Sequence, residues 1–188
     1  MAADIDIDFA DRNDILQHIK YTAARKSRKD KPEKHNTGVY VQPIPYDPML
    51  NCATIDFEEA DKRGYFKLDF LNVNVYKQIR DYKHYEELLK REPPWHRLKE
   101  KAFVEQISHI SNYPDLVAKH MPDSIPRMAM FIAALRPAKK HLLGKPWADM
   151  AKEIWVKSDS EDYAFKQSHS VSYAVLVALH MNIVDTAT

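Results

Sequence analysis

Two short stretches place aspartates among apolar residues in a way that could hold divalent cations. The first is Asp4-Ile5-Asp6-Ile7-Asp8-Phe9 and the second is Phe66-Lys67-Leu68-Asp69-Phe70-Leu71. The strict alternation of the first predicts a strand with its carboxylates on one face, spaced by about 7 Å. Carboxylates that share a face repel one another unless cations neutralise them. The pattern suits two Mg²⁺ ions held for phosphoryl or nucleotidyl transfer, and equally a solvated edge strand whose charges prevent further pairing.

The composition is that of a globular chain and not of a disordered or strongly basic one. Of the 188 residues, 45% are hydrophobic and 29% are charged, and the formal net charge is +1. This length is enough for one domain or two small lobes. The low net charge excludes a generic polycation, so any nucleic-acid surface must come from local clustering of basic residues.

The few cysteines and glycines, and the spacing of the histidines, exclude several kinds of site and favour an intracellular location. Cys52 is the single cysteine, which excludes an internal disulfide and a cysteine zinc site and fits a reducing cytoplasm. The three glycines, Gly38, Gly64 and Gly144, do not form a glycine-rich phosphate loop, and no histidine pair has zinc-site spacing. The sequence shows neither a run of 18 apolar residues nor a basic signal peptide. We therefore expect a soluble cytoplasmic protein that does not enter a membrane.

Hydrophobic periodicity predicts an α+β fold class, with a change of pattern near residue 75. Residues 1–75 indicate a small α+β unit with strands over the two acidic stretches, over 39–41 and over 52–57. Asp11 is typical of a helix N-cap, and the helix is expected to end in the basic run 25–34. We interpret that run as an exposed loop, which could also grip a phosphate backbone. Residues 76–188 indicate an all-helical lobe, and its expected helices cover 75–89, 98–111, 125–135, 147–155 and 170–183.

Five stretches, in this order, resemble the catalytic core of the C-family DNA polymerases, the family of the bacterial replicative DNA polymerase III alpha subunit. The first acidic stretch resembles the palm motif with two catalytic aspartates, and Gly64–Leu71 resembles the Lys-x-Asp-Phe-Leu strand that supplies a third. Lys34–Val41 is similar to a Lys-His-x-x-Gly-Val segment. Met130–Pro137 is similar to a fingers stretch ending in Arg-Pro, and Phe165–Ala174 to a Phe-x-Lys-Ser-His segment ending in Tyr-Ala.

The resemblance implies a small palm-like sheet of the nucleotidyltransferase, polymerase beta-like type over residues 1–75, followed by a fingers-like helical lobe over 76–188. It implies that Asp4, Asp6 and Asp69 are catalytic and bind two Mg²⁺ ions, with Mn²⁺ as a possible substitute. One ion would lower the pKa of a primer 3′-hydroxyl, and the other would hold the triphosphate. Asp8 matches a third acid of the family motif and is given a supporting role.

The resemblance also implies nucleotide or DNA contacts for six further residues, each of which has a simpler structural alternative. These residues are Lys34, His35, Lys67, Arg136, Lys166 and His169. Lys67 shares a strand face with Asp69 and could form only a local ion pair with it. Arg136 could only cap the helix that it ends. Supporting roles are expected for Gly38, which allows close backbone approach, and for Ser168, as the N-cap of the last helix.

The chain departs from the family pattern at three points, one of which is the loop that family members use against the triphosphate. The upstream Gly-Ser loop of the family is not found, Ala138 stands where glycine follows Arg-Pro, and Asn72 stands where glycine follows Phe-Leu. Compact versions of host enzymes are typical of bacteriophages, so we expect a bacteriophage source. A second polypeptide could complete the enzyme. The expected function is a DNA polymerase, whole or split, with primer-template DNA, dNTPs and a replisome protein as partners. The alternatives are a non-catalytic DNA- or replisome-binding module and a metal-dependent nuclease.

Overall fold

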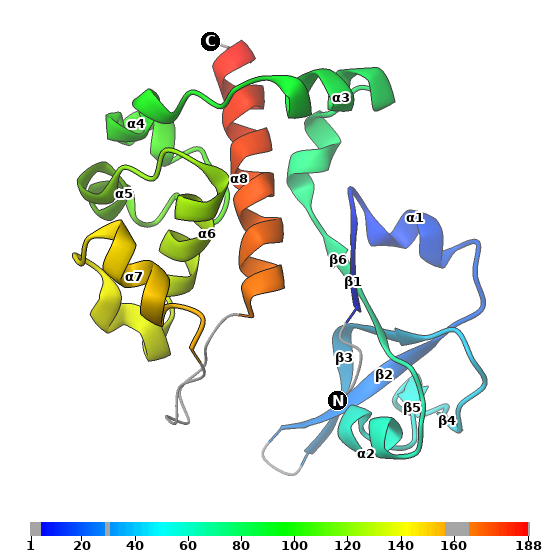
Figure 1. Ribbon diagram of the computed structural model, residues 1–188. Coiled ribbons are helices and arrows are strands. Elements are labelled where there is room, and N and C mark those ends of the chain that lie inside the picture. Colours follow the sequence, from blue (N-terminus) through cyan, green and yellow to red (C-terminus); the bar gives the residue numbers. More distant parts are fainter. Residues whose placement is uncertain (1–4, 29–30, 157–165, 188) are drawn as a thin grey trace. The chain divides into compact units, whose positions relative to one another are not determined.

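The chain folds into mixed α+β structure in two compact units, Met1–Gln78 and Ile79–Thr188. A computed structural model describes residues 5–28, 31–156 and 166–187 (Figure 1). Within these residues, every strand belongs to the first unit, and the second unit is helical. The division falls close to residue 75, where the sequence pattern changes from strand-like to helical.

The first unit is built on a four-stranded mixed sheet in the order β1-β6-β3-β2. β1 runs parallel to β6, whereas β3 is antiparallel to both β6 and β2. A two-stranded hairpin, β4-β5, lies beside this sheet. The six strands, in chain order, are Ile5–Phe9, Thr22–Arg28, Lys31–Tyr40, Tyr46–Asp47, Cys52–Ala53 and Leu68–Asn72.

Short helices connect these strands, and side-chain caps explain where two of them begin. α1 (Arg12–Leu16) begins after Asp11, whose carboxylate accepts the N–H of Asn13, as the sequence predicts. α2 (Phe57–Lys62) begins in the same way after Asp56. The strand expected over 52–57 is therefore cut short to β5. A 3₁₀ helix, η1 (Asn74–Gln78), ends the unit.

The interpretation of the basic run 25–34 as an exposed loop is wrong, because residues 25–28 and 31–34 pair with each other as parts of β2 and β3. Opposite charges face each other across it, with Lys26 Nζ 3.4 Å from Glu33 Oε1. Pro32 is tolerated because β3 pairs with β6 only at Gly38 and Val39, so no third strand lies beside it. Helix α1 accordingly ends at Leu16, well before the run.

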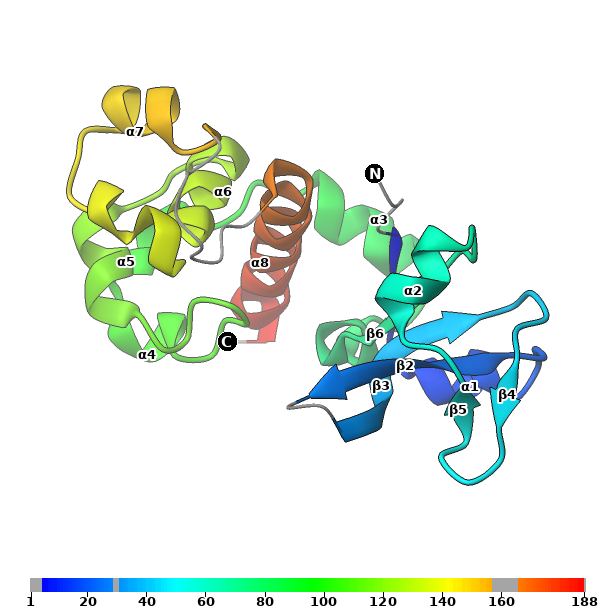
Figure 2. The same ribbon diagram turned by 90° about the horizontal axis from the view of Figure 1, so that it is seen from below.

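The second unit packs around α8 (Gln167–Ala187), as Figures 1 and 2 show. α6 (Ile125–Ala134) makes the most extensive contact with it, and their buried side chains share one core. Near the C-terminal end of α8, Asn182 Nδ2 donates to the carbonyl oxygens of Leu88 (2.9 Å) and Arg91 (3.0 Å). The remaining elements are α3 (Tyr82–Lys90), η2 (Trp95–Lys99), α4 (Lys101–Val104), α5 (Pro114–His120), η3 (Pro137–Leu142) and α7 (Trp147–Glu153).

Two helices that the sequence predicts as continuous are each broken in the structure. The helix expected over 75–89 is split into η1 and α3, because Asp81 accepts the N–H of His84 (2.8 Å) and caps a new helix. The helix expected over 98–111 becomes η2 and α4. It cannot continue through His109, whose φ of +68° lies in the left-handed region. The expected helices over 125–135 and 147–155 are confirmed as α6 and α7.

Helix α8 also has the length and hydropathy of a membrane-spanning segment. Among the described residues it alone meets both criteria, with a mean hydropathy of 1.2. Of this apolar window, 56% is buried inside the protein, as in the core helix of a globular unit.

Candidate functional site

The parallel pairing of β1 with β6 places Asp6 directly opposite Asp69. Neighbouring strands lie about 4.8 Å apart, and opposite residues of a parallel pair project from the same face of the sheet. Asp6 is exposed, whereas Asp69 is buried, with 7% of its surface accessible. Asp8 follows on the same face, opposite Leu71. Asp4 lies outside the described residues.

Both carboxylate oxygens of Asp69 accept a hydrogen bond from a neighbouring side chain. Thr37 Oγ1 donates to Oδ1 at 2.7 Å, and Lys67 Nζ donates to Oδ2. The Lys67 ammonium also lies 5.7 Å from the centre of the Phe57 ring, within cation–π range. Asp69 is therefore held rigidly, and Lys67 forms the local ion pair that was one alternative for it.

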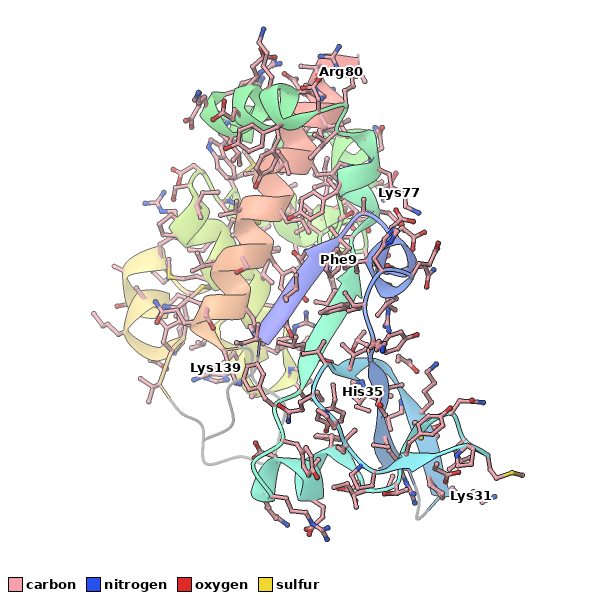
Figure 3. All side chains as sticks on the ribbon, turned by 90° about the vertical axis from the view of Figure 1, so that its right-hand side faces the viewer. Phe9, Lys31, His35, Lys77, Arg80 and Lys139 are labelled. Atoms are coloured by element: carbon pink, nitrogen blue, oxygen red, sulfur yellow. The ribbon has the colours of Figure 1, made fainter. Side chains whose placement is uncertain are left out.

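Thr37, Lys67, Phe57 and His35 form a cluster of side chains around Asp69. His35 belongs to it as a neutral side chain. Its Nδ1 accepts the backbone N–H groups of Gly38 (2.9 Å) and Thr37 (3.3 Å), so the proton of the ring is on Nε2. Burial, reinforced by the Lys67 charge, lowers the pKa of His35. The 3.8 Å approach of Nδ1 to Asp69 Oδ1 is consequently not an ion pair at neutral pH. His35 lies on β3 between the β1–β6 strands and the Lys31 end of the hairpin (Figure 3).

Gly38 allows β3 to come close to Lys67 and to β2. A Cβ atom at this position would lie 2.9 Å from both Ala24 Cβ and Lys67 Cδ, and 3.1 Å from His35 Nδ1. The backbone is irregular here, because the β2 partner shifts from Val39 to Lys34 between neighbouring pairs. This irregular stretch turns both His35 and Thr37 towards Asp69. Close approach, which the sequence predicts for Gly38, is confirmed.

Asp8 lies in an environment that disfavours its charge. Asp8 is exposed at the surface, yet partial desolvation raises its pKa, and the neighbouring Asp6 carboxylate raises it further, while a hydrogen bond with the Tyr76 side chain opposes both. Two acids on one strand face therefore repel each other, and Tyr76 of η1 offsets only part of the cost. A bound cation would relieve this repulsion.

Lys34 lines an open pocket of about 430 Å³ on the first unit together with Arg12 and His35. Arg12 is held there by two hydrogen bonds. Its backbone N–H donates to Asn72 Oδ1 at 2.7 Å, and its guanidinium donates to the carbonyl oxygen of Asn36. The pocket thus joins residues from α1, β3 and the end of β6, and His35 belongs both to it and to the cluster around Asp69.

The other residues implicated by the sequence belong to the second unit. Arg136 follows α6 and precedes η3, and its charge adds to burial in lowering the pKa of His109. Lys166 and His169 flank the start of α8. Because α8 already begins at Gln167, Ser168 lies inside its first turn, and its prediction as the N-cap is wrong. The sequence pattern placed the helix start three residues later, at Ser170.

Two members of the cluster were not assigned a role from the sequence. Thr37 stands in the Lys34–Val41 stretch at a position that the family pattern leaves open, and Phe57 begins α2. Only the irregular backbone of β3 and the helix cap at Asp56 bring them to Asp69. In the part of the chain that the structure describes, no group of three or more histidine, cysteine, aspartate or glutamate side chains is arranged to hold a metal ion.

Comparison of the chain with protein-family models, with curated protein sequences and with solved structures finds no match.

Proposed function

We propose that the first unit is a palm-like nucleotidyltransferase centre and that the protein acts as a DNA polymerase of the C-family type, alone or as one part of a split enzyme. The observation that carries this proposal is the register that sets Asp6 opposite Asp69 on adjacent parallel strands. This register brings together two of the three acids that the resemblance assigns to catalysis, although they are distant in sequence. The third, Asp4, precedes β1.

The donor chemistry of this face fits Mg²⁺ or Mn²⁺. Both ions prefer hard oxygen ligands, and carboxylates on neighbouring strands supply them from a rigid support. Partial burial and the neighbouring Asp6 charge both raise the pKa of Asp8, and this penalty on its charge is a further reason for a cation at this face. When bound, two ions would activate a primer 3′-hydroxyl and neutralise the triphosphate of a dNTP.

The protein's own side chains would orient the bound cations and contact the nucleotide. Asp69, fixed by Thr37 and Lys67, supplies an oriented ligand, and the exposed Asp6 supplies one that a nucleotide can reach. Lys67, released from Asp69 by a cation, would be available to a phosphate oxygen. The setting would be the cytoplasm of a bacterial host, with the gene carried by a bacteriophage.

Primer extension by the purified full chain tests this proposal. The assay would use a primed template, four dNTPs and either Mg²⁺ or Mn²⁺, and would compare the protein with Asp6→Asn and Asp69→Asn. Asp61→Asn is the matched control, because it neutralises an exposed carboxylate on α2 of the same unit. We expect extension by the protein and the control and a loss of at least 100-fold in both site variants. Equal extension by all four proteins would contradict the proposal.

One observation favours a second candidate, a non-catalytic DNA- or replisome-binding module. Asp69 already has a cationic partner in Lys67 and a hydrogen-bond donor in Thr37, so a purely structural ion pair explains its burial. Under this alternative, primed DNA would bind without any extension. Addition of Mg²⁺ would change neither the stability of the protein nor that of its Asp69→Asn variant.

A further inference from the structure

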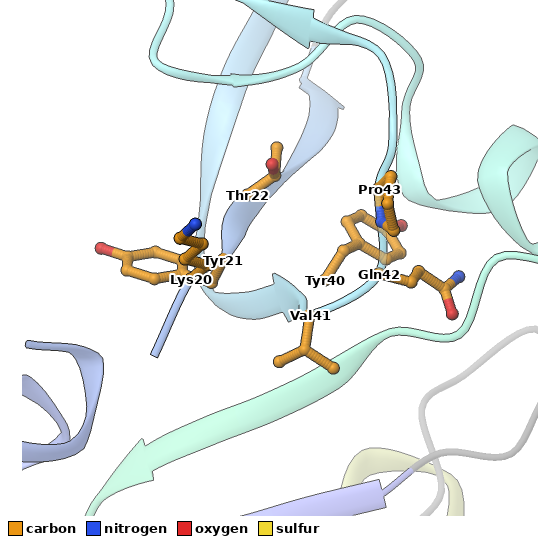
Figure 4. Close-up of a pocket in the computed structure, with 7 residues that line it drawn as sticks. All are labelled: Lys20, Tyr21, Thr22, Tyr40, Val41, Gln42 and Pro43. Carbon is orange, nitrogen blue, oxygen red and sulfur yellow. The ribbon is translucent and has the colours of Figure 1, made fainter. Parts of the chain in front are cut away.

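Two open pockets of the first unit adjoin at Tyr21. The larger, of about 430 Å³, is lined by Arg12, Lys34, His35, Asn36, Asn72 and Tyr21, among others. The smaller, of about 250 Å³, is lined by Tyr21, Lys20, Val41 and Gln42, among others. Figure 4 shows Lys20 and Tyr21 on one side of the smaller pocket, Tyr40, Gln42 and Pro43 on the other, and Val41 between the two sides. Tyr21 therefore lies where the two pockets meet.

The larger pocket is equipped to bind an anion. Arg12 and Lys34 bring two positive charges, and the described residues that line the pocket include no aspartate or glutamate. The guanidinium of Arg12 has five N–H donors, and its hydrogen bond to the Asn36 carbonyl fixes its position while using only part of them. His35 adds the N–H of its Nε2, because its Nδ1 is already an acceptor for two backbone groups. Phosphate is the anion that such a mixture of guanidinium, ammonium and imidazole donors suits best.

Tyr21 and Lys20 place an exposed aromatic side chain and a positive charge in the smaller pocket. Tyr21 as a residue is 38% exposed, although aromatic side chains of this size usually gain from burial. An exposed ring beside basic side chains is the arrangement on which proteins stack bases of single strands. Lys20, which precedes Tyr21 in sequence, is exposed, lines the smaller pocket and offers a third positive charge.

We propose that the two pockets form one binding track for single-stranded nucleic acid. Arg12 and Lys34 hold one backbone phosphate, Tyr21 stacks on a base, and Lys20 meets the phosphate of a neighbouring nucleotide. A duplex is disfavoured, because its bases are paired and cannot be laid on Tyr21. The inference rests on the proposed function for its ligand class, but it requires no cation at Asp6 or Asp69.

Fluorescence anisotropy of a labelled oligothymidylate, titrated with the full chain in EDTA, tests the track. Stacking on one ring accounts for about 1–3 kcal/mol, so Tyr21→Leu should weaken binding about 5- to 150-fold, while Tyr21→Phe keeps the affinity within about twofold. Lys34→Gln should weaken binding several-fold and reduce the slope of log affinity against log salt by about 0.7. Lys62→Gln, which removes an exposed charge from α2 of the same unit, is the control and should change the affinity by less than about twofold.

Three results would overturn the track: unchanged affinity in both Tyr21→Leu and Lys34→Gln, equal affinity for a blunt duplex, or equal affinity for dTTP alone, which would indicate a mononucleotide pocket. These variants alter exposed side chains, so circular dichroism can verify folding independently. The Asp6→Asn/Asp69→Asn variant separates this inference from the proposed function. Strand binding that persists in this variant and depends on Tyr21, in a protein that never extends a primer, would refute a polymerase that acts alone and leave the track standing.

Discussion

Asp6 of β1 lies opposite Asp69 of β6 in a parallel register, and the two side chains leave the same face of the sheet. The environments of the two acids differ. Asp69 is buried and bonded to Thr37 and Lys67, whereas Asp6 is exposed beside Asp8. A rigid acid next to an accessible one is what a centre needs if it is to fix a cation and still admit a substrate.

Replacing Lys67 should make the stability of the first unit depend on Mg²⁺. Only 20% of the Lys67 side chain and 10% of the Asp69 side chain are exposed, so Lys67→Met leaves a buried carboxylate without its cation. We expect a loss of about 2–4 kcal/mol in the free energy of unfolding, measured by urea denaturation. Millimolar Mg²⁺ should restore part of it.

The control for this prediction is Lys67→Met/Asp69→Asn, in which the buried carboxylate is also neutralised. This double variant should be more stable than Lys67→Met alone and should respond little to Mg²⁺. If Mg²⁺ stabilised both variants equally, the ion would act elsewhere, and the cation site at Asp69 would be refuted.

Gly38→Ala should destabilise the first unit through a contact and not through backbone strain. The added Cβ would lie 2.9 Å from Ala24 Cβ, a fully buried atom that cannot rotate away, and overpacking of this kind costs about 1–3 kcal/mol. Ala24→Gly removes the opposing methyl group. A double-mutant cycle of the two changes, followed by urea denaturation, should therefore show a favourable coupling of about 1 kcal/mol. Strictly additive losses would contradict the contact.

Local patterns in the sequence predicted the strands that carry the acids, but long-range pairing decided the rest of the site. The alternation around Asp6 and the cap at Asp11 depend on neighbouring residues, and both are found in the structure. The pairing of β1 with β6 depends on the intervening chain, so no spacing rule gives the Asp6–Asp69 register. The basic run 25–34 was misread for the same reason: the pairing of Lys26 with Glu33 across a hairpin outweighs the loop-like composition. Thr37 reaches Asp69 only because β3 is irregular beside it.

Asp8→Asn should stabilise the first unit at neutral pH. The pKa of Asp8 is raised above 3.8, so the folded state binds more protons than the unfolded state between 3.8 and the folded pKa. Stability therefore falls as the pH rises through that window and stays lower above it. Asparagine removes the charge and keeps an acceptor for Tyr76. Because the side chain is partly solvated, we expect a gain of less than about 1 kcal/mol in urea denaturation at pH 7.

The gain from Asp8→Asn should vanish below pH 3.8, where Asp8 is protonated in both states. Asp14→Asn provides a contrast, because it neutralises an exposed acid in the first turn of α1, where a negative charge is slightly favourable. It should leave stability unchanged or lower it slightly. A loss of stability in Asp8→Asn at pH 7 would contradict the repulsion between Asp6 and Asp8.

The helical unit should lose stability as the pH falls below 6.5, because burial lowers the pKa values of His109, His120 and His180. The unfolded state binds the protons that the folded state excludes, so the loss begins at the unfolded value and continues down to the folded ones. His120 Nε2 is buried without a hydrogen-bond partner among the described residues, and its ring packs on Phe131 and Trp147. His120→Phe should therefore stabilise the unit slightly and reduce the pH dependence by about one proton.

Tryptophan fluorescence can follow this transition, because all three tryptophans lie in residues 79–188. Urea denaturation at several pH values between about 7.5 and 5.5 would give the slope of the free energy of unfolding against pH. His96→Gln, on the exposed side of η2, is the control and should leave the slope unchanged. A slope in His120→Phe equal to that of the unaltered protein would show that His120 does not resist protonation in the folded state.

The most direct test of the proposed cation centre at Asp6 and Asp69 is cleavage of the chain by Fe²⁺. Fe²⁺ can enter oxygen-ligand sites of Mg²⁺ and, with ascorbate and peroxide, cuts the backbone beside the bound ion. The account predicts cleavage within β6 (Leu68–Asn72) that excess Mg²⁺ suppresses and that Asp6→Asn/Asp69→Asn abolishes. Cleavage that is absent from β6, or that persists unchanged in the double variant, would contradict it.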